Sequence, residues 1–444
     1  MKQLKIIVLI TLCYLSWFVK ASSLEIIRDA ELESFTKKIV NSLVKDSEID
    51  LDEINYYFVK SKDINAFVTS GNNLFINTEI LISANDYREY AAVLAHELAH
   101  ILGGHVFRTK QEISNLGSRA FPIYVLGILG ILGGAAETGM ATLMVGSASV
   151  QDGYTYYSRT QEASADQAAV KLLCNNKIDG RYLLDFLDKL DQAIPYSSEQ
   201  TSYRSTHPII SDRITWIKSA LLNQYNECTF NRNATLQDEF LLLRAKLFGF
   251  THSGDETNAV YQSDKDIDKY ARAVASYFSG NHENSINLLD QLIKKNPENP
   301  FFRELIGEIY FSKHNYELAI KHQEISIELL NEENDLYYMM IGNYHLANTN
   351  ESDYHGSIKF LKKSLRLNPK NTYSWYLLAK AYAENDNLPL AEYATAERYY
   401  LTGNYKMAHQ FTMKSLKNIE KNTTEWYRAN DLLNIIDNIQ LQDS

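Results

Sequence analysis

The stretch "AAVLAHELAHILGGH" (residues 91–105) decides how the first half of the chain folds and what it can bind. Its alanine, leucine and valine residues favour a helix, and no proline interrupts it. Because a helix turns by about 100° per residue, His96 and His100 share one face, with Glu97 one step round. This is the H-E-x-x-H pattern, which places two zinc ligands and a general base on one helix.

The third histidine of this stretch, His105, does not fit the same pattern as a ligand. In the longer motif H-E-x-x-H-x-x-G-x-x-H the glycine matches Gly103, but the last histidine would stand at Val106. On a continuing helix His105 would also point about 180° away from His96. We therefore predict that His105 is a helix-end or surface residue and that a third ligand comes from elsewhere.

A second acidic motif is the candidate for that third ligand. Within "YYSRTQEASADQAAVKLL" (residues 156–173), Glu162 and Asp166 are four residues apart and share one helical face. The small alanine side chains of this helix allow another helix to pack closely against it. A carboxylate buried in such a contact needs a metal or a partner. We predict that Glu162 binds the metal and that Asp166 accepts the free N–H of His96 or His100. A solvent-facing acidic pair is the alternative.

Length, composition and net charge limit the classes of protein to which the chain can belong. The chain has 444 residues, enough for two or three domains. Its share of apolar residues, 45%, and of charged residues, 22%, is ordinary for a globular protein. A net charge of -11 and the lack of a basic stripe argue against nucleic-acid binding.

The N-terminus "MKQLKIIVLITLCYLSWFVKASS" has the layout of a secretory signal peptide. A lysine-bearing start precedes an apolar stretch, and Val19 and Ala21 are small residues before a cleavage point after Ala21. We predict a signal peptide over residues 1–21. An uncleaved membrane anchor is the alternative, although the stretch is short for a span of about 20 residues.

Cleavage at that point would leave two cysteines, Cys174 and Cys228. In an oxidising compartment they can form a disulfide. Two separate buried thiols are the other possibility, because the sequence does not place the two residues near each other.

Residues 24–45 have a helical pattern, and then the period changes. The stretch "INYYFVKSKDINAFVTSGNNLFINTEIL" (residues 54–81) is rich in β-forming residues, with a turn at residues 71–73. It predicts a small antiparallel sheet whose last strand leads into the helices before His96. A strand beside such a helix can hold an extended peptide through main-chain hydrogen bonds; a purely structural hairpin is the alternative.

The segment "FPIYVLGILGILGGAAETGMATLMVGSASV" (residues 121–150) is apolar and glycine-rich, and Glu137 is its single charge. Three interpretations stay open: a buried helical hairpin, a surface loop that contacts membrane or hydrophobic clients, and a membrane span. The apolar run before Glu137 is too short for a comfortable span.

The second half of the chain has an internal repeat. A polar stretch at residues 251–266 is typical of a linker. From residue 267 a period of about 34 residues begins, with small residues such as Gly307, Ala319 and Gly342 between aromatic ones such as Trp375. These segments resemble tetratricopeptide repeats, about four of them with the last irregular. Such a solenoid offers a concave face for a partner.

A further histidine stands in "STHPIISDRI" (residues 205–214). His207 precedes a proline, and Arg213 follows on what the pattern predicts to be a new helix. From the residues alone His207 is either a loop histidine or a site histidine.

Three blocks, with His96 and His100, with Glu162 and Asp166, and with His207 and Arg213, come in an order that resembles zinc peptidases of the HtpX and CAAX-prenyl protease type. The resemblance covers residues from roughly 40 to 220. With the leader ahead and the repeats behind, the chain is similar end to end to BepA-type periplasmic proteases.

The resemblance implies a set of residue roles. They are one Zn²⁺ per chain on His96, His100 and Glu162, with Glu97 as the general base. His207 has two alternative roles: it stabilises the oxyanion in an open state, or it binds zinc at the open position and holds the enzyme latent. In this scheme Asp166 supports the ligands.

The resemblance also implies a fold and a function. We expect a mostly α protein with a small antiparallel sheet, in which a gluzincin-type zinc protease domain (residues 22–250) precedes an α-solenoid of tetratricopeptide repeats (residues 267–444). The expected activity is that of a periplasmic zinc endopeptidase in the assembly and quality control of outer-membrane proteins, with chaperone activity besides. The expected partners are unfolded or misassembled outer-membrane proteins and, through the repeats, the outer-membrane assembly machinery; residues 121–150 are the candidate for peripheral membrane contact. The alternative is a non-proteolytic chaperone or adaptor that docks onto that machinery.

Overall fold

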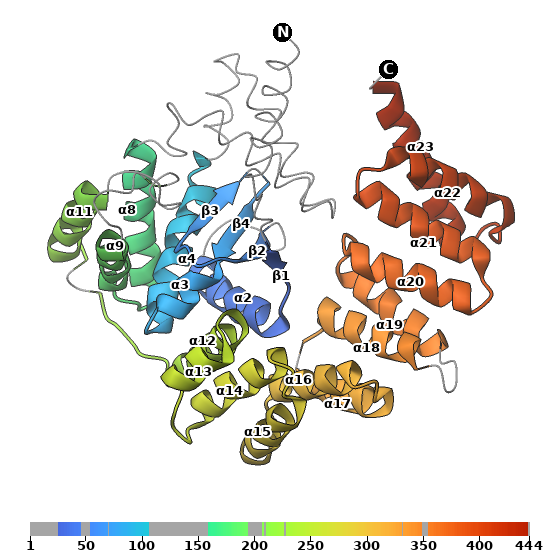
Figure 1. Cartoon of the computed structure of the whole chain (residues 1–444). Helices are drawn as coiled ribbons and strands as arrows, with labels where there is room; N and C mark the ends of the chain where they lie inside the picture. The colour runs from blue at the N-terminus through green and yellow to red at the C-terminus, as the bar shows by residue number, and fades with distance from the viewer. Residues whose placement is uncertain are drawn as a thin grey trace, which may run out of the picture.

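The computed structural model describes residues 25–45, 54–69, 71–105, 159–193, 207, 210–225, 228–330, 332–348 and 354–442. These residues form a small sheet, a group of helices around it and a long array of paired helices (Figure 1). The expected signal peptide and the glycine-rich segment 121–150 lie outside the described residues. Within the described ranges no helix combines the length and the apolar character needed to cross a bilayer.

The sheet has four strands in the order β1-β2-β4-β3. They are β1 (Glu25–Ile27), β2 (Asn55–Lys60), β3 (Ala66–Thr69) and β4 (Asn73–Asn77). The pairs β1–β2 and β3–β4 are antiparallel, but β2 and β4 run parallel, so the sheet is mixed rather than antiparallel as expected. The reason is that β4 inserts between β2 and β3. The turn from β3 to β4 contains Gly71 (φ 84°) and Asn72 (φ 53°), two residue types that tolerate the left-handed region.

The first described residues differ from the helical pattern expected for residues 24–45. Strand β1 comes first, because residues 25–27 pair with the end of β2. Helix α2 (Ala30–Val44) follows, and its N-cap Asp29 accepts a hydrogen bond from the backbone N–H of Leu32 at 2.8 Å. Pairing with a neighbouring strand thus overrides the local helical preference at this end.

The H-E-x-x-H stretch lies on α4 (Tyr87–Leu102), the central helix of this half. Helix α3 (Thr78–Ser83) leads into it from the sheet. Every residue of α4 from Glu89 to His100 is buried, because α2, β3 and the later helices surround it. The closest of these neighbours is α8 (Arg159–Asn175), whose buried Ala165 and Ala169 let the two helices approach.

Two more helices complete this half on the side of α8. They are α9 (Arg181–Ala193) and α11 (Ile210–Asn223), which contact each other. A disulfide joins Cys174, near the end of α8, to Cys228, with the two Cα atoms 5.6 Å apart. Of the two possibilities for the cysteines, the structure therefore has the bonded pair.

Helix α12 (Ala234–Thr251) belongs to both halves of the chain. Its residues Phe240, Leu243 and Leu247 are part of the core that the sheet, α2, α4, α8 and α9 share. Its Leu242 and Phe250 pack against the core of the first repeat helices. Helix α13 (Gly254–Val260) follows, so part of the segment 251–266 that we expected to be a linker is helical.

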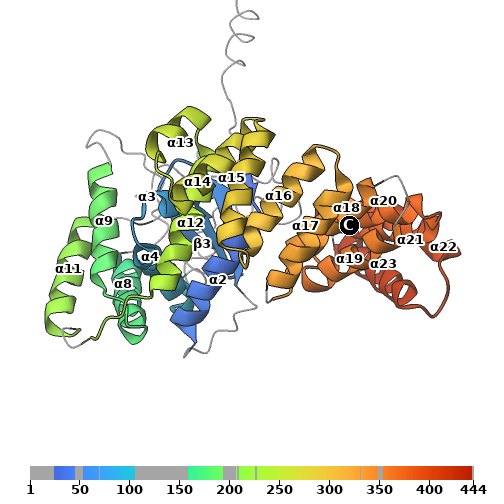
Figure 2. The same ribbon diagram turned by 90° about the horizontal axis from the view of Figure 1, so that it is seen from below.

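The described part of the array consists of five helix pairs, one more than the sequence suggested. The helices are α14 (Asp266–Phe278), α15 (His282–Lys295), α16 (Pro300–Ser312), α17 (Tyr316–Leu329), α18 (Asp335–Ala347), α19 (Tyr354–Leu367), α20 (Thr372–Glu384), α21 (Leu388–Leu401), α22 (Tyr405–Asn418) and α23 (Thr424–Gln442). The array begins beneath the sheet at α14 and curves away to α23 (Figure 1). In Figure 2, α9 and α11 lie at one end of the molecule and α20–α23 at the other.

Small residues set the spacing inside the helix pairs, as the repeat pattern predicts. A Cβ on Gly342 of α18 would lie 2.7 Å from Cγ of Leu361 in α19. A Cβ on Gly307 of α16 would lie 3.3 Å from the backbone oxygen of Ala319 in α17. The glycines therefore allow neighbouring helices to pack closely.

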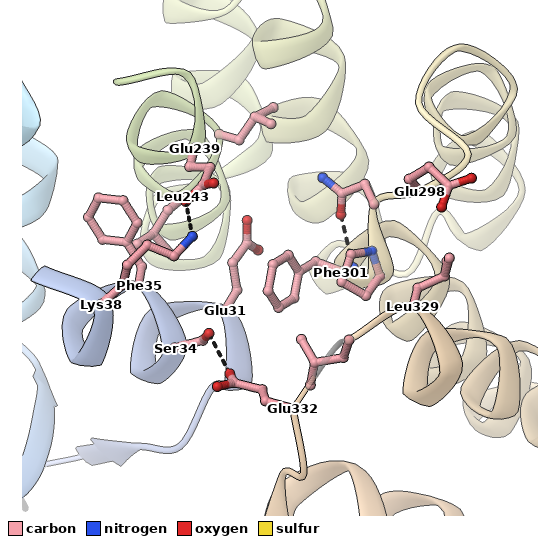
Figure 3. A pocket seen from close by; sticks show the side chains of 14 residues that line it. Glu31, Ser34, Phe35, Lys38, Glu239, Leu243, Glu298, Phe301, Leu329 and Glu332 are labelled. Carbon is pink, nitrogen blue, oxygen red and sulfur yellow. Dashed lines mark hydrogen bonds and ion pairs between the residues drawn. The ribbon is translucent and has the colours of Figure 1, made fainter. Parts of the chain in front are cut away.

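A cavity of about 450 Å³ lies where α2 and α12 meet the N-terminal end of α16 and the C-terminal end of α17 (Figure 3). Its apolar lining includes Phe35 and Phe301. Two pairs of polar residues bridge elements at its rim: Lys38 Nζ lies 2.6 Å from Glu239 Oε2, and the Ser34 hydroxyl donates to Glu332 at 2.7 Å. Contacts to Glu332 therefore tie α2 to the repeat array.

Glu31 of the cavity lining belongs to a group of mostly buried ionisable side chains that we call the junction cluster: Asp29, Glu31, Lys246 and Glu304. Lys246 Nζ lies 2.6 Å from an oxygen of Asp29, 3.2 Å from one of Glu31 and 3.8 Å from one of Glu304. Tyr270 of α14 donates to Glu31 at 2.8 Å. One ammonium group on α12 thus links α2 to α16.

Candidate metal centre

Two histidines of α4 and one glutamate of α8 converge on a common point. The Nε2 atoms of His96 and His100 are 3.1 Å apart. Oxygens of Glu162 lie 3.6 Å from Nε2 of His96 and 3.3 Å from Nε2 of His100. All three side chains are buried. The structure thus brings together the two distant segments that the sequence singled out.

The spacing of these atoms fits a single metal ion. In a tetrahedral zinc site with bonds of about 2.0–2.1 Å, neighbouring donor atoms are about 3.3 Å apart. The observed separations of 3.1 to 3.6 Å bracket that value. In addition, Oε2 of Glu162 is buried and makes no hydrogen bond of good geometry, although it forms an ion pair with Nη1 of Arg213 at 2.7 Å. Imidazole nitrogens with a carboxylate oxygen are donors that zinc accepts.

His207 joins the same group of donor atoms. It lies before α11, fully buried, with Nδ1 3.0 Å from Oε1 of Glu162. Its Nε2 contacts the backbone oxygen of Ala66 in β3 at 3.1 Å. One donor atom from each of His96, His100, Glu162 and His207 fits within 4.8 Å of the others. We call these four residues the His/Glu cluster.

Each of the two α4 histidines turns its other ring nitrogen to a buried partner. Nδ1 of His96 lies 3.0 Å from Oδ1 of Asp166, so of the two histidines expected for Asp166 the structure selects His96. Nδ1 of His100 lies 3.0 Å from Nδ1 of His105. His105 is just past the end of α4, one of the two expected alternatives, but it is 3% exposed and so is not a surface residue.

Arg213 of α11 holds both carboxylates of α8. Its Nε and Nη2 each donate to Asp166 at 2.8 Å, a bidentate pair. Its Nη1 lies 2.7 Å from Oε2 of Glu162. Sequence reasoning placed Arg213 at the start of a helix near His207 but did not predict these contacts.

Burial and this arginine together set the charge of the two carboxylates. Burial raises the pKa of Asp166, but Arg213 and His96 together outweigh burial and the pKa falls below its ordinary value. Burial likewise raises the pKa of Glu162, and His207 and Arg213 together bring it well below the usual range. Both groups are therefore carboxylates, the form that binds a metal or orients its ligands.

Glu97 differs from these carboxylates because it makes no ion pair with an arginine or a lysine among the described residues. It is completely buried, and neither carboxylate oxygen has a hydrogen-bond partner in the described part of the chain. Nε2 of His207 lies 3.5 Å from its Oε1. Burial raises the pKa of Glu97. Its acceptor capacity is therefore available to a water molecule or a substrate group.

The pKa values of the two α4 histidines are shifted in opposite directions. Burial and the Arg213 charge act against protonation of His96, yet its bonds to Asp166 and Glu162 raise its pKa to about 9. Burial lowers the pKa of His100 well below the usual value. Because a metal binds neutral imidazole, a metal ion at this position competes with a proton on His96.

The comparison with protein families agrees with this geometry. The model of Peptidase family M48 matches residues 28–221, a range that contains the whole His/Glu cluster. Residues 28–221 form an M48 peptidase domain. With its His/Glu cluster, the protein is a metalloendopeptidase. Models of the tetratricopeptide repeat match residues 270–329 and 360–393, so the predicted order of M48 domain and repeat solenoid is confirmed.

Two curated relatives align with most of the chain, and a third aligns with a smaller part of it. The chain is 25% identical over 397 residues to the beta-barrel assembly-enhancing protease of Yersinia pestis, across 87% of this chain and 79% of the relative. It is 24% identical over 409 residues to the putative beta-barrel assembly-enhancing protease of Vibrio cholerae, across 89% of this chain and 82% of the relative. The metalloprotease LoiP of Escherichia coli is 27% identical over 175 residues, 39% of this chain and 66% of LoiP.

Proposed function

We propose that this metalloendopeptidase is a zinc enzyme of the periplasm that acts in the assembly and quality control of outer-membrane proteins. The observation that carries the chemistry is the convergence of His96, His100 and Glu162, with donor atoms 3.1 to 3.6 Å apart. Three protein ligands with a further position for water are typical of catalytic zinc. The relatives named for β-barrel assembly, which align over most of the chain, support the substrate class.

In this proposal His96, His100 and Glu162 hold the zinc ion. When bound, zinc supplies an acidified water and stabilises the developing negative charge. Glu97 accepts the proton of the attacking water and passes it to the leaving amine; its raised pKa suits a group that takes up and releases a proton. Asp166, held by Arg213, accepts the Nδ1–H of His96 and fixes its tautomer.

We propose that His207 keeps the enzyme latent. If its Nε2–H donates to the Ala66 carbonyl, its Nδ1 lone pair faces the cluster as a fourth donor. The same contact occupies a carbonyl of β3, an edge strand beside α4 to which an extended peptide could pair. In the alternative role His207 moves away and stabilises the oxyanion.

The proposed location rests on two features of the chain. Residues 1–21 have the signal-peptide pattern, and the Cys174–Cys228 disulfide favours an oxidising compartment. In the same scheme residues 22–250 are the peptidase domain, residues 251–266 the connection and residues 267–444 the repeat domain. Residues 121–150 are the candidate for peripheral membrane contact.

The repeats are the proposed docking surface for the outer-membrane assembly machinery, and unfolded or misassembled outer-membrane proteins are the proposed clients. An extended helical array and the names of the relatives support this assignment. Chaperone activity without cleavage is a separate candidate function. It predicts that a variant unable to cleave still suppresses aggregation of an unfolded β-barrel protein.

Three proteins test the proposal: the wild-type chain, Glu97→Gln and His207→Ala. Glu97→Gln should keep its zinc while casein degradation falls by about 10²- to 10⁴-fold, because the proton acceptor is lost. His207→Ala should raise the basal rate if His207 is a plug and lower it if it only stabilises charge. Cleavage by Glu97→Gln at the wild-type rate would rule out Glu97 as the base.

A further inference from the structure

We infer that His105 is a positioning residue for His100: it accepts a hydrogen bond from the outer nitrogen of that ring and so holds the inner nitrogen toward the metal. The inference rests on the proposed function, because it assumes that His100 is a metal ligand. It concerns a residue that the H-E-x-x-H pattern does not include.

The two α4 histidines are arranged alike. Each directs Nε2 to the His/Glu cluster and Nδ1 away from it. A histidine that binds a metal through Nε2 carries its proton on Nδ1, and that proton needs an acceptor. For His96 the acceptor is Asp166, at 3.0 Å. For His100 the structure places Nδ1 of His105 in the corresponding position, also at 3.0 Å.

The backbone after α4 is shaped to bring His105 to this position. The helix ends at Leu102, and Gly104 has a φ of 59°, which turns the chain back. A Cβ on Gly103 would lie 2.5 Å from Nε2 of His105 and 2.8 Å from its Cε1. Any side chain at residue 103 would therefore displace the His105 ring.

A second contact ties His105 to the helix that carries the third donor. The side-chain amide of Gln161 donates to the backbone oxygen of His105 at 3.3 Å. Gln161 is the residue directly before Glu162 on α8. The segment after α4 is thus fixed both to the His100 ring and to the start of α8.

The choice of an imidazole as acceptor has a chemical reason. Glu97, Glu162 and Asp166 are already three buried carboxyl groups in this site, and Arg213 forms ion pairs with only Glu162 and Asp166 among them. A fourth carboxylate behind His100 would add a buried negative charge with no described cation to offset it, which is costly. A neutral imidazole accepts the same hydrogen bond without that cost.

The test compares zinc affinity in full-length variants, measured by competition with a chromophoric chelator. His105→Phe keeps an aromatic ring but lacks the nitrogen that accepts the hydrogen bond. It should weaken zinc binding by about 10- to 100-fold. His105→Asn places an amide oxygen near the lost Nδ1 and should recover most of that affinity. His355→Phe, at an exposed position on α19, is the matched control and should bind zinc like wild type. The absorption spectrum of the Co²⁺-loaded forms should change for His105→Phe and not for His105→Asn.

A double-mutant cycle keeps the test independent of whether His105→Phe folds. Gly103→Ala should weaken zinc binding in the wild-type background, because its Cβ displaces the ring. In a His105→Ala background the same change should have no further effect. Equal weakening in both backgrounds, or wild-type affinity in His105→Phe, would overturn the inference alone. A wild-type chain that binds no zinc would overturn the proposed function together with it.

Discussion

Arg213 is a buried cation that holds the two carboxylates of α8, Asp166 and Glu162, in place. It donates to both oxygens of Asp166 and contacts Glu162, and it is 5% exposed. Removing one partner of a buried charge pair leaves the other charge uncompensated. The stability of the metal-free protein should therefore depend on this residue more than on any surface ion pair.

Replacing Arg213 by methionine should lower the free energy of unfolding of the metal-free protein by about 3–5 kcal/mol. Zinc should restore part of the loss, since it offsets the charge of Glu162 but not that of Asp166. Urea unfolding with and without zinc measures both effects. Arg181→Met is the control, because Arg181 pairs with Asp179 while 72% exposed and should matter little. Equal stability of Arg213→Met and wild type would contradict this account.

The spacing of histidines and carboxylates in the sequence predicts some residues of the metal site but not others. The i,i+4 pairs on two predicted helices were enough to propose His96, His100, Glu162 and Asp166 as one group. The contact of His105 with His100 was not predicted, because on a continuing helix the ring would point away from His96, whereas α4 ends at Leu102. The Gly103–Gly104 pair was the available signal for that end. The role of Arg213 depends on how α11 packs on α8, which no local pattern encodes.

At the scale of elements, asparagine marks the beginning of most repeat helices. The N-cap asparagines of the array are Asn281, Asn299, Asn315, Asn334, Asn371, Asn387 and Asn404. Each accepts a hydrogen bond from a backbone N–H in the first turn, which stabilises the helix start. The caps at Asn387 and Asn404 mark α21 and α22 as separate helices, whereas the repeat period alone suggested about four repeats with the last irregular.

The sheet shows the limit of local patterns. The β3–β4 hairpin follows from two β-rich stretches around Gly71 and Asn72. The parallel pairing of β2 with β4 does not, because β4 inserts between two strands that precede it in the sequence. Strand limits could be predicted here, but strand order could not.

The crossing of α12 and α14 depends on Gly249. A Cβ at this position would lie 2.4 Å from the backbone oxygen of Ala271 and 3.1 Å from Cβ of Val274. Alanine normally stabilises a helix interior relative to glycine. Here Gly249→Ala should instead destabilise the protein by about 1–3 kcal/mol, because the helices must move apart.

Thermal unfolding of Gly249→Ala and Gly307→Ala measures this effect. Gly307→Ala is the control with less crowding, because the nearest atom to the added Cβ is 3.3 Å away rather than 2.4 Å. We expect a much larger fall in Tm for Gly249→Ala than for Gly307→Ala. A rise in Tm for Gly249→Ala would show that helix propensity, and not close packing, dominates at the crossing.

At the scale of the whole molecule, the M48 domain and the first repeats are joined by more than a linker. Helix α12 has side chains in both cores, and the junction cluster connects α2 with α16 through Lys246. Arg28 also contacts Asp335 of α18 at 3.1 Å. The sequence predicted the order of the two parts, but these contacts join residues far apart in the chain and could not be predicted from it.

The junction should make stability depend on pH. Burial raises the pKa of Glu304 to about 8 from its ordinary 4.5, although Lys246 acts to lower it. Between these values the folded protein holds a proton that the unfolded chain has lost. The free energy of unfolding should therefore fall as the pH rises through this window.

Calorimetry at several pH values from about 5 to 8 isolates this contribution when wild type is compared with Glu304→Gln. The variant cannot titrate at this position, so its stability should fall less steeply over the same range. Glu298→Gln, at an exposed position near the cavity, should behave like wild type. Identical pH profiles for wild type and Glu304→Gln would show that Glu304 does not carry the proton.

Metal stoichiometry by mass spectrometry tests the central claim most directly. Full-length wild type, Glu162→Gln and the exposed control Glu298→Gln are loaded with Zn²⁺ and freed of excess metal. We predict one zinc ion per chain in wild type and in Glu298→Gln, and a large loss in Glu162→Gln, because three protein ligands are then reduced to two. A wild-type chain without zinc, or Glu162→Gln that retains it as tightly as wild type, would contradict the claim that α4 and α8 together hold the catalytic metal.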